Sequence, residues 1–284
     1  MPVFASPQPI SVAVDLADAA VRLVASERSD TEVEIRSLDA EDPLAIQAAV
    51  VDFHDGRLTI SRPKATPWTW KWAVDLVTGS SGVEVLIGLP TGSDVRCEAG
   101  YGEIRAEGEF GDCRLRTSYG DISLDRATTA EVRTAGGTVE VNRVEGRAQV
   151  AAGTGDLRIG QVGGPATIKN DYGQTSVRRV GGELRLIGSY GDTTVGHAGA
   201  DVKARTAYGS VTIDEVVRGT VSLTTTGGRL EVGIREGTAA WLDVQTSYGT
   251  VRNSLPTRRG PEGFTDKVEI HASTRDGDIV IRRS

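Results

Sequence analysis

Residues 172–213 contain the pattern that decides the fold: YGQTSVRRVGGELRLIGS, then YGDTTVGHAGADVKARTA, then YGSVTI. Each segment begins with a tyrosine and a glycine, and these glycines are 18 residues apart. The glycine returns at spacings of 17 to 21 residues, with a last copy after 28; its positions are Gly102, Gly120, Gly137, Gly155, Gly173, Gly191, Gly209, Gly228, Gly249 and Gly277. A period in this range predicts an architecture built from structural repeats.

Apolar and polar residues alternate on both sides of each glycine. Leu157 and Ile159 follow Gly155 by two and four residues, and Ala148 and Val150 precede it by seven and five. Charged and hydroxyl residues occupy most positions between them. A period of two is typical of a strand with one buried face, so each unit is predicted to hold two short strands joined by a glycine turn.

Two assemblies fit this unit: an antiparallel meander and a parallel solenoid in which each unit forms one coil. Equivalent residues of stacked coils are about 4.8 Å apart, so the coils of a solenoid must be nearly equal in length. The hairpins of a meander need not be equal in length. The regular spacing therefore predicts an all-β fold, a parallel β-solenoid (β-helix) with two-strand coils of about 18 residues over residues 91–284. A loop is expected to be inserted near residues 253–267.

Residues 1–90 are less regular and are predicted to form a β-rich cap over the open end of the solenoid. One short helix is expected over Asp42–Val51, because Asp42 is a suitable N-cap and Pro43 suits the first helical position. The expected strands of the cap are Ser11–Asp15, Val21–Ala25, Val33–Ser37 and Arg57–Ser61.

Composition and charge exclude several classes of protein. The chain has 284 residues and a formal net charge of −7, which argues against specific binding of nucleic acid but is compatible with a local basic face. Residues 1–20 lack the basic and apolar regions of a secretory signal, and no uncharged apolar run approaches the ~18 residues of a membrane span. These features predict a cytoplasmic protein.

The sequence contains none of the common catalytic motifs for nucleophilic serine, phosphate-binding loop, metalloprotease helix or dinucleotide site. Acidic residues follow several turn glycines, as at Asp156 and Asp192, but the glycine-rich turn of a calcium-binding β-roll is missing. We interpret these acids as turn caps. No metal and no cofactor are predicted.

Basic residues gather at the outward positions of the strand that precedes each glycine. They are Arg96, Arg114, Arg116, Arg133, Lys169, Arg185, Lys203 and Arg205, against the acids Glu98, Glu131 and Asp243. One interpretation is a binding face for an anionic polymer, a membrane surface or an acidic partner. The other is a solvated sheet with ladders of mixed charge.

Three tryptophans, Trp68, Trp70 and Trp72, alternate along one expected strand and so share one of its faces. They either fill the core of the cap or form a surface for self-association.

Tyrosines and cysteines receive structural interpretations. Tyr172, Tyr190 and Tyr208 precede successive glycines and are predicted to stack at one corner. Cys97 and Cys113 are expected to be small core residues in neighbouring coils. Their diagonal placement, about 7–8 Å apart at the backbone, is beyond the reach of a disulfide.

The repeated Tyr-Gly-Asp-Ile/Thr-x-Leu/Val units resemble the bacterial "putative adhesin" family of β-strand-repeat domains of unknown function. The segments Val216–Gly219 and Gly233–Val244, which include Trp241, are similar to those of its cytoplasm-type members. The resemblance covers essentially the whole chain and implies a β-solenoid. It brings no catalytic residues to this sequence.

Together these features predict a non-catalytic β-solenoid that acts as a scaffold or interaction module, with a protein partner or a second copy as its ligand. Two alternatives stay open. One is a carbohydrate-active β-helix enzyme that acts on an anionic polymer, which would need a deep groove with paired carboxylates or bases. The other is a self-polymerising rod, which would need uncovered end coils.

Overall fold

A computed structural model describes residues 2–38, 49–61, 82–256, 263 and 265–284. The chain forms two compact units, Met1–Gly137 and Thr138–Ser284. All secondary-structure elements of the described residues are β-strands, which confirms the all-β prediction. The structure has no helix, within these residues, that is long and apolar enough to cross a membrane.

The first unit is organised around one long strand, β2, which forms a complete coil by itself. Its first part pairs with β5 on one side and β7 on the other, and its second part pairs in the same way with β6 and β8. The strands of this unit are β1 (Val3–Ala5), β2 (Ser11–Ser26), β3 (Asp30–Ser37), β4 (Val50–His54), β5 (Arg57–Ser61), β6 (Val83–Pro90), β7 (Asp94–Tyr101), β8 (Ile104–Tyr119) and β9 (Ile122–Gly136).

The N-terminal cap changes the pairing of the sheet from parallel to antiparallel. Strand β3 pairs antiparallel with β6, β1 with β3, and β4 with β5. The rings of Phe4 and Phe53 stack with their centroids 4.8 Å apart and join β1 to β4. Short antiparallel strands therefore cover the first coils, as the predicted cap requires.

The helix expected over Asp42–Val51 is wrong at its C-terminal end. Val50 and Val51 begin strand β4, where they pair with Ser61 and Ile60 of β5. The local start signals for a helix are outweighed here by pairing with a neighbouring strand. Residues 42–48 lie outside the described residues.

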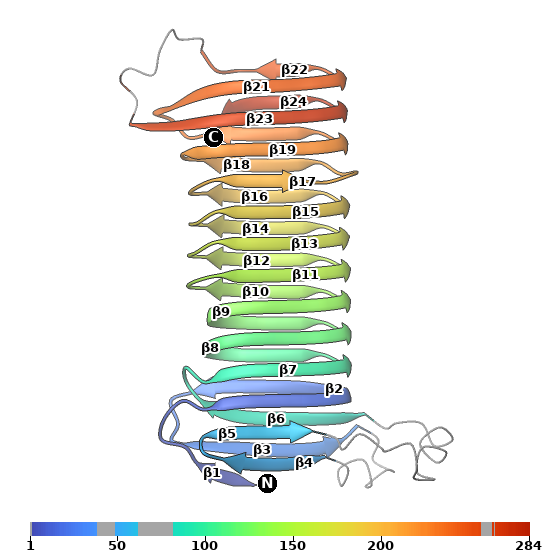
Figure 1. The fold of residues 1–284 in the computed structure, drawn as a ribbon, viewed down its shortest axis with the longest axis vertical. Coiled ribbons are helices and arrows are strands. Elements are labelled where there is room, and N and C mark those ends of the chain that lie inside the picture. The colour runs from blue at the N-terminus through green and yellow to red at the C-terminus, as the bar shows by residue number, and fades with distance from the viewer. Residues whose placement is uncertain (1, 39–48, 62–81, 257–262, 264) are drawn as a thin grey trace, which may run out of the picture. The chain divides into compact units, whose positions relative to one another are not determined.

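The second unit is a stack of parallel coils, which confirms the solenoid (Figure 1). Each coil contributes one strand to each of two facing sheets, and the register advances by one repeat from coil to coil, as in the pairs Leu157–Thr175 and Thr175–Thr193. The inward side chains of these strands form the core. The strands are β10 (Val139–Val144), β11 (Ala148–Thr154), β12 (Leu157–Val162), β13 (Ala166–Tyr172), β14 (Thr175–Val180), β15 (Leu184–Tyr190), β16 (Thr193–Ala198), β17 (Val202–Arg205), β18 (Val211–Val216), β19 (Gly219–Gly227), β20 (Leu230–Ile234), β21 (Thr238–Tyr248), β22 (Val251–Asn253), β23 (Asp266–Asp276) and β24 (Ile279–Arg283).

The last two coils do not stack in the order of the chain. Strands β23 and β24 pair with β19 and β20 on one side and with β21 and β22 on the other, so the C-terminal coil lies between two earlier ones (Figure 1). Its inward residues Ile270, Ile279 and Ile281 are completely buried there. The more apolar coil thus takes the interior position. The described residues of the connecting loop, 254–256, 263 and 265, form no strand.

The repeated glycines form a column at one corner of the coils. Gly191 has φ +131°, and a Cβ at this residue would overlap the carbonyl oxygen of Gly173 in the neighbouring coil. Gly209, with φ +144°, approaches Gly191 in the same way. Only glycine satisfies both the backbone angle and the close approach.

Gly191→Ala is expected to lower the free energy of unfolding by about 3 kcal/mol, because the new Cβ meets both an unfavourable φ and a backbone carbonyl. Gly237→Ala is the matched control. Gly237 has φ +79°, and a Cβ there has no atom within 4 Å, so its substitution should cost only about 1–2 kcal/mol. Urea denaturation of the two variants measures the difference, and equal losses would contradict a role for the close approach.

Candidate binding face

The eight predicted basic residues all lie at outward positions of their strands. Arg96, Arg114, Arg116 and Arg133 belong to β7, β8 and β9 of the first unit. Lys169, Arg185, Lys203 and Arg205 belong to β13, β15 and β17 of the second. Seven of them are exposed and Arg116 is half-buried. The two groups have different electrostatic surroundings, and each is described by itself.

In the first unit the arginines are held by carboxylates. The Glu131 carboxylate forms ion pairs with Arg116, Arg114 and Arg133, with N···O distances of 2.6, 2.9 and 3.1 Å. The Glu131 side chain is only 19% exposed. The hydrogen bond from Arg116 and the positive charge of the other two guanidinium groups lower the pKa of the Glu131 carboxyl. This part of the sheet is a lattice of paired charges.

Because the pKa of Glu131 is lower in the folded chain, its ionisation stabilises the fold at neutral pH, and this contribution is lost as pH falls below about 4.3. Glu131→Gln should lower the free energy of unfolding at pH 7 and flatten its fall below that pH. Urea denaturation between pH 7 and pH 3 measures both effects. Glu140→Gln, at an exposed outward position of β10, is the control, and an identical pH profile for the two variants would contradict this account.

Of the four predicted basic residues in the second unit, three have no carboxylate partner among the described residues. Lys169 is paired with Asp171 at 3.2 Å, but Arg185, Lys203 and Arg205 have no ion pair to any residue that the structure describes. We call these three residues the free basic cluster. Arg185 and Lys203 are direct neighbours on β15 and β17, and Arg205 lies two residues further along the same face of β17.

Hydroxyl side chains border the free basic cluster on both sides. Thr167 of β13 is paired with Arg185, while Ser222 and Thr224 of β19 are paired with Lys203 and Arg205. The face therefore offers three cations and adjacent hydroxyl donors across four neighbouring strands. Such a set of groups is suited to bind phosphate, sulfate or carboxylate oxygens.

The same sheet continues to an exposed aromatic cluster that the sequence did not reveal. Trp241 on β21 is 56% exposed, and its ring and that of His271 form a T-shaped contact with centroids 5.4 Å apart. The Nε2 atom of His271 lies 3.0 Å from Glu269 Oε1, and its Nδ1 atom lies 3.4 Å from Asp243 Oδ2. Sequence alternation places Trp241 and Asp243 on one face, but His271 becomes their neighbour only through the unexpected position of β23.

The other aromatic predictions have separate outcomes. Tyr172, Tyr190 and Tyr208 stack at one corner with centroids 5.2 and 5.3 Å apart, which confirms the predicted column. Gly227 follows Tyr208 in this column, and a Cβ there would contact the tyrosine ring. The proposed interface residues Trp68, Trp70 and Trp72 lie outside the described residues, so that hypothesis stays a prediction.

The acids after the glycines cap the backbone of the neighbouring coil. A carboxylate oxygen of Asp192 accepts the backbone N–H of Ser210 at 2.7 Å, and one of Asp278 accepts that of Thr250 at 2.8 Å. The bond from Thr250 lowers the pKa of Asp278. Among the described residues no group of three or more His, Cys, Asp or Glu side chains is arranged to hold a metal ion.

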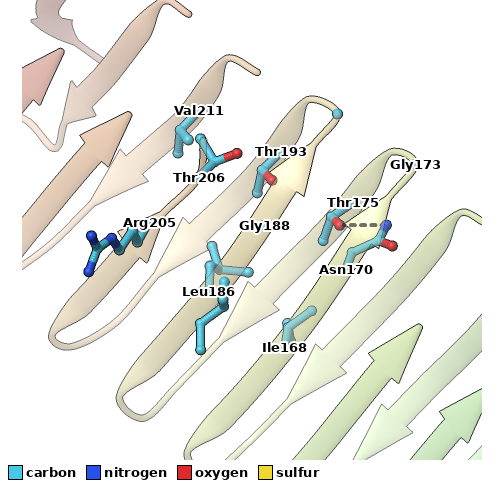
Figure 2. Close-up of a pocket in the computed structure, with 12 residues that line it drawn as sticks. Ile168, Asn170, Gly173, Thr175, Leu186, Gly188, Thr193, Arg205, Thr206 and Val211 are labelled. Atoms are coloured by element: carbon cyan, nitrogen blue, oxygen red, sulfur yellow. Dashed lines mark hydrogen bonds between the residues drawn. The ribbon is translucent and has the colours of Figure 1, made fainter. Parts of the chain in front are cut away.

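A small cavity lies beside the glycine corner (Figure 2). Gly188 of β15 has no side chain to fill the space between Asn170 and Thr206 on the adjacent coils. The Asn170 Oδ1 and Thr206 Oγ1 atoms are buried and have no hydrogen-bond partner there. The cavity measures about 10 Å³, at the lower limit of the space for one water molecule.

Gly188→Ser is expected to raise the free energy of unfolding by about 1 kcal/mol, because serine restricts the unfolded chain and offers its hydroxyl to the two unpaired atoms. The new Cβ would lie 3.2 Å from Thr206 Oγ1, so this gain requires a small shift of the Thr206 side chain. Gly188→Ala fills the space without a hydroxyl and should gain less. Thermal unfolding of both variants tests this, and a loss of stability with serine would contradict it.

The two cysteines are free, buried thiols, as predicted. Cys97 pairs with Leu115, and Cys113 pairs with Val95, so the cysteines are diagonal neighbours on β7 and β8. Burial raises the pKa of each thiol to about 12. Both thiols therefore stay protonated and unreactive at neutral pH.

Comparisons with known proteins give a family. The family model described as Toastrack DUF4097 matches residues 10–282. No curated protein matches the sequence. One similar solved structure is a "putative cell adhesion protein" from Clostridium sporogenes, 10% identical, which covers 100% of this chain and 98% of that chain with a TM-score of 0.23. Another is a "putative adhesin" from Bacteroides fragilis, 10% identical, which covers 99% and 95% with a TM-score of 0.30. The family match spans both units of this chain.

Proposed function

The chain belongs to the Toastrack DUF4097 family, and we propose that this member is a non-catalytic interaction module that binds an anionic polymer on the free basic cluster. The observation that supports the proposal is the gathering of Arg185, Lys203 and Arg205 on one face without a described carboxylate partner, in a chain whose net charge is −7. A sulfated or phosphorylated polysaccharide is the class of polymer that these groups fit.

The spacing of the cations suits an extended ligand with repeated charges. Arg185 and Lys203 are one strand spacing apart, about 4.8 Å, and Arg205 is about 7 Å further along its strand than Lys203. Like charges on neighbouring strands repel each other, and a bound anion removes that repulsion. The arginines around Glu131 already share one carboxylate, so a bound anion gains less there than at the free basic cluster.

Ion pairs on an exposed sheet are screened by salt, so binding should be salt-dependent. The Debye length is about 8 Å at 0.15 M ionic strength and about 30 Å at 0.01 M. We expect binding at low ionic strength that weakens strongly toward physiological salt. The bordering Thr167, Ser222 and Thr224 add hydrogen bonds that salt screens less.

The double variant Lys203→Glu/Arg205→Glu should weaken binding of heparin, used as the probe, at least tenfold at low salt. Two of the three attractive charges of the cluster become repulsive, while the exposed positions keep the fold intact. Isothermal titration with heparin fragments of defined length, at several salt concentrations, measures the change.

The matched control is Arg158→Glu/Arg178→Glu, which changes the net charge equally but lies at exposed positions of β12 and β14 on the opposite sheet. Equal losses for the two double variants would show an effect of net charge alone and contradict the proposal. Binding to phosphatidylserine vesicles without binding to heparin would also contradict it, in favour of a membrane surface.

A further inference from the structure

The outermost coil of the second unit has an open edge. Strands β21 and β22 pair with β23 and β24 on their inner side, and no strand in the described part of the chain pairs with their outer side. The edge of β21 is 11 residues long and contains no lysine and no proline, the residues that commonly protect such an edge.

The core of the solenoid reaches solvent at this edge. Leu242 and Val244 point inward but are only half-buried, and Val251 is 40% exposed. Ile270 and Ile279, at the corresponding positions of the adjacent coil, are completely buried. One further layer of strands would complete the burial of this coil.

We propose that a second copy of this chain supplies that layer, through two-fold antiparallel pairing of β21 with the same strand of the second copy. A pair centred on Val244 sets Leu242 opposite Thr246 of the second copy on the inner face. On the outer face it sets Asp243 opposite Gln245 and Trp241 opposite Ser247. Asp243 is the one charged residue of β21 and meets a neutral amide, so the edge is self-complementary.

Within its described residues the first unit offers no edge that matches β21. The outermost strands of its cap are β1, with three residues, and β4, with five, and both pair antiparallel to their neighbours. A head-to-tail addition of copies would set the 11-residue β21 against one of these short strands. Two-fold pairing of β21 with itself matches the edge completely and closes after two copies.

The pairing does not rest on the proposed function, but it would strengthen it. The paired strands continue one sheet through both copies, and a two-fold axis normal to that sheet leaves both free basic clusters on the same side. Lys203 is then seven strand spacings, about 34 Å, from Lys203 of the second copy. A long anionic polymer that reaches both clusters gains avidity.

Sedimentation equilibrium of the full chain between about 1 and 200 μM should show a reversible dimer. Gln245→Asp sets two carboxylates opposite each other at two places in the pair and should weaken dimerisation at least tenfold. Gln245→Lys sets an ammonium group opposite Asp243 and should strengthen it at low salt. Gln149→Asp, at an exposed position of β11 away from the edge, is the control and should leave the dimer unchanged.

A monomer at 200 μM overturns the proposal. So does a dimer that responds equally to Gln245→Asp and Gln149→Asp, because the contact then lies elsewhere. The heparin titration keeps the two proposals separable: the Gln245→Asp variant should still bind short heparin fragments as a monomer, and the Lys203→Glu/Arg205→Glu variant should still dimerise.

A distance measurement tests the geometry of the pair. A spin label at Ser222→Cys lies two strands from the edge, so two labels should be five strand spacings, about 24 Å, apart at the backbone. The buried Cys97 and Cys113 thiols would not take the label. A dimer without a distance in this range overturns the pairing of β21 with itself.

Discussion

The approach of glycine backbones at one corner of the coils is the constraint on which the other features depend. Gly209 faces the carbonyl oxygen of Gly191, and Gly277 faces that of Gly228, each with a positive φ. Because no Cβ fits between these backbones, each glycine must align with that of the next coil. The register is thereby the same from coil to coil, and residues at equal offsets from the glycine form straight columns.

Because of these columns, charged residues that are one repeat apart in the sequence become neighbours on the surface of the sheet. Glu131 forms ion pairs with three arginines because it stands beside Arg114 in one column, with Arg116 and Arg133 in the next. Arg185 and Lys203 stand in a column bordered by Thr167 and Ser222, so no acid reaches them. Whether a basic residue joins a lattice of paired charges or a free basic cluster thus depends on which residue lies one repeat away.

The sequence predicts those parts of the structure that follow from local periodicity. The parallel coils, the outward basic residues and the stacked tyrosines all follow from the 18-residue spacing. The order of the last coils does not, because the sequence repeats the glycine at both Gly249 and Gly277, and burial of Ile270 favours the inner position for its coil. The helix expected to end at Val51 fails for a related reason, since pairing with Ile60 is a non-local contact.

The composition of the last coils explains why one of them can lie outside. Had β23 and β24 formed the end of the stack, Ile270, Ile279 and Ile281 would have faced solvent. Strand β21 instead presents Leu242 and Val244 beside Thr246, a less apolar set of inward residues. Its regular alternation still matches the geometry of a pleated edge. A strand with both properties is suited to an interface that forms and dissociates. Because β23 lies between β19 and β21, strand β21 is left at the edge of the sheet.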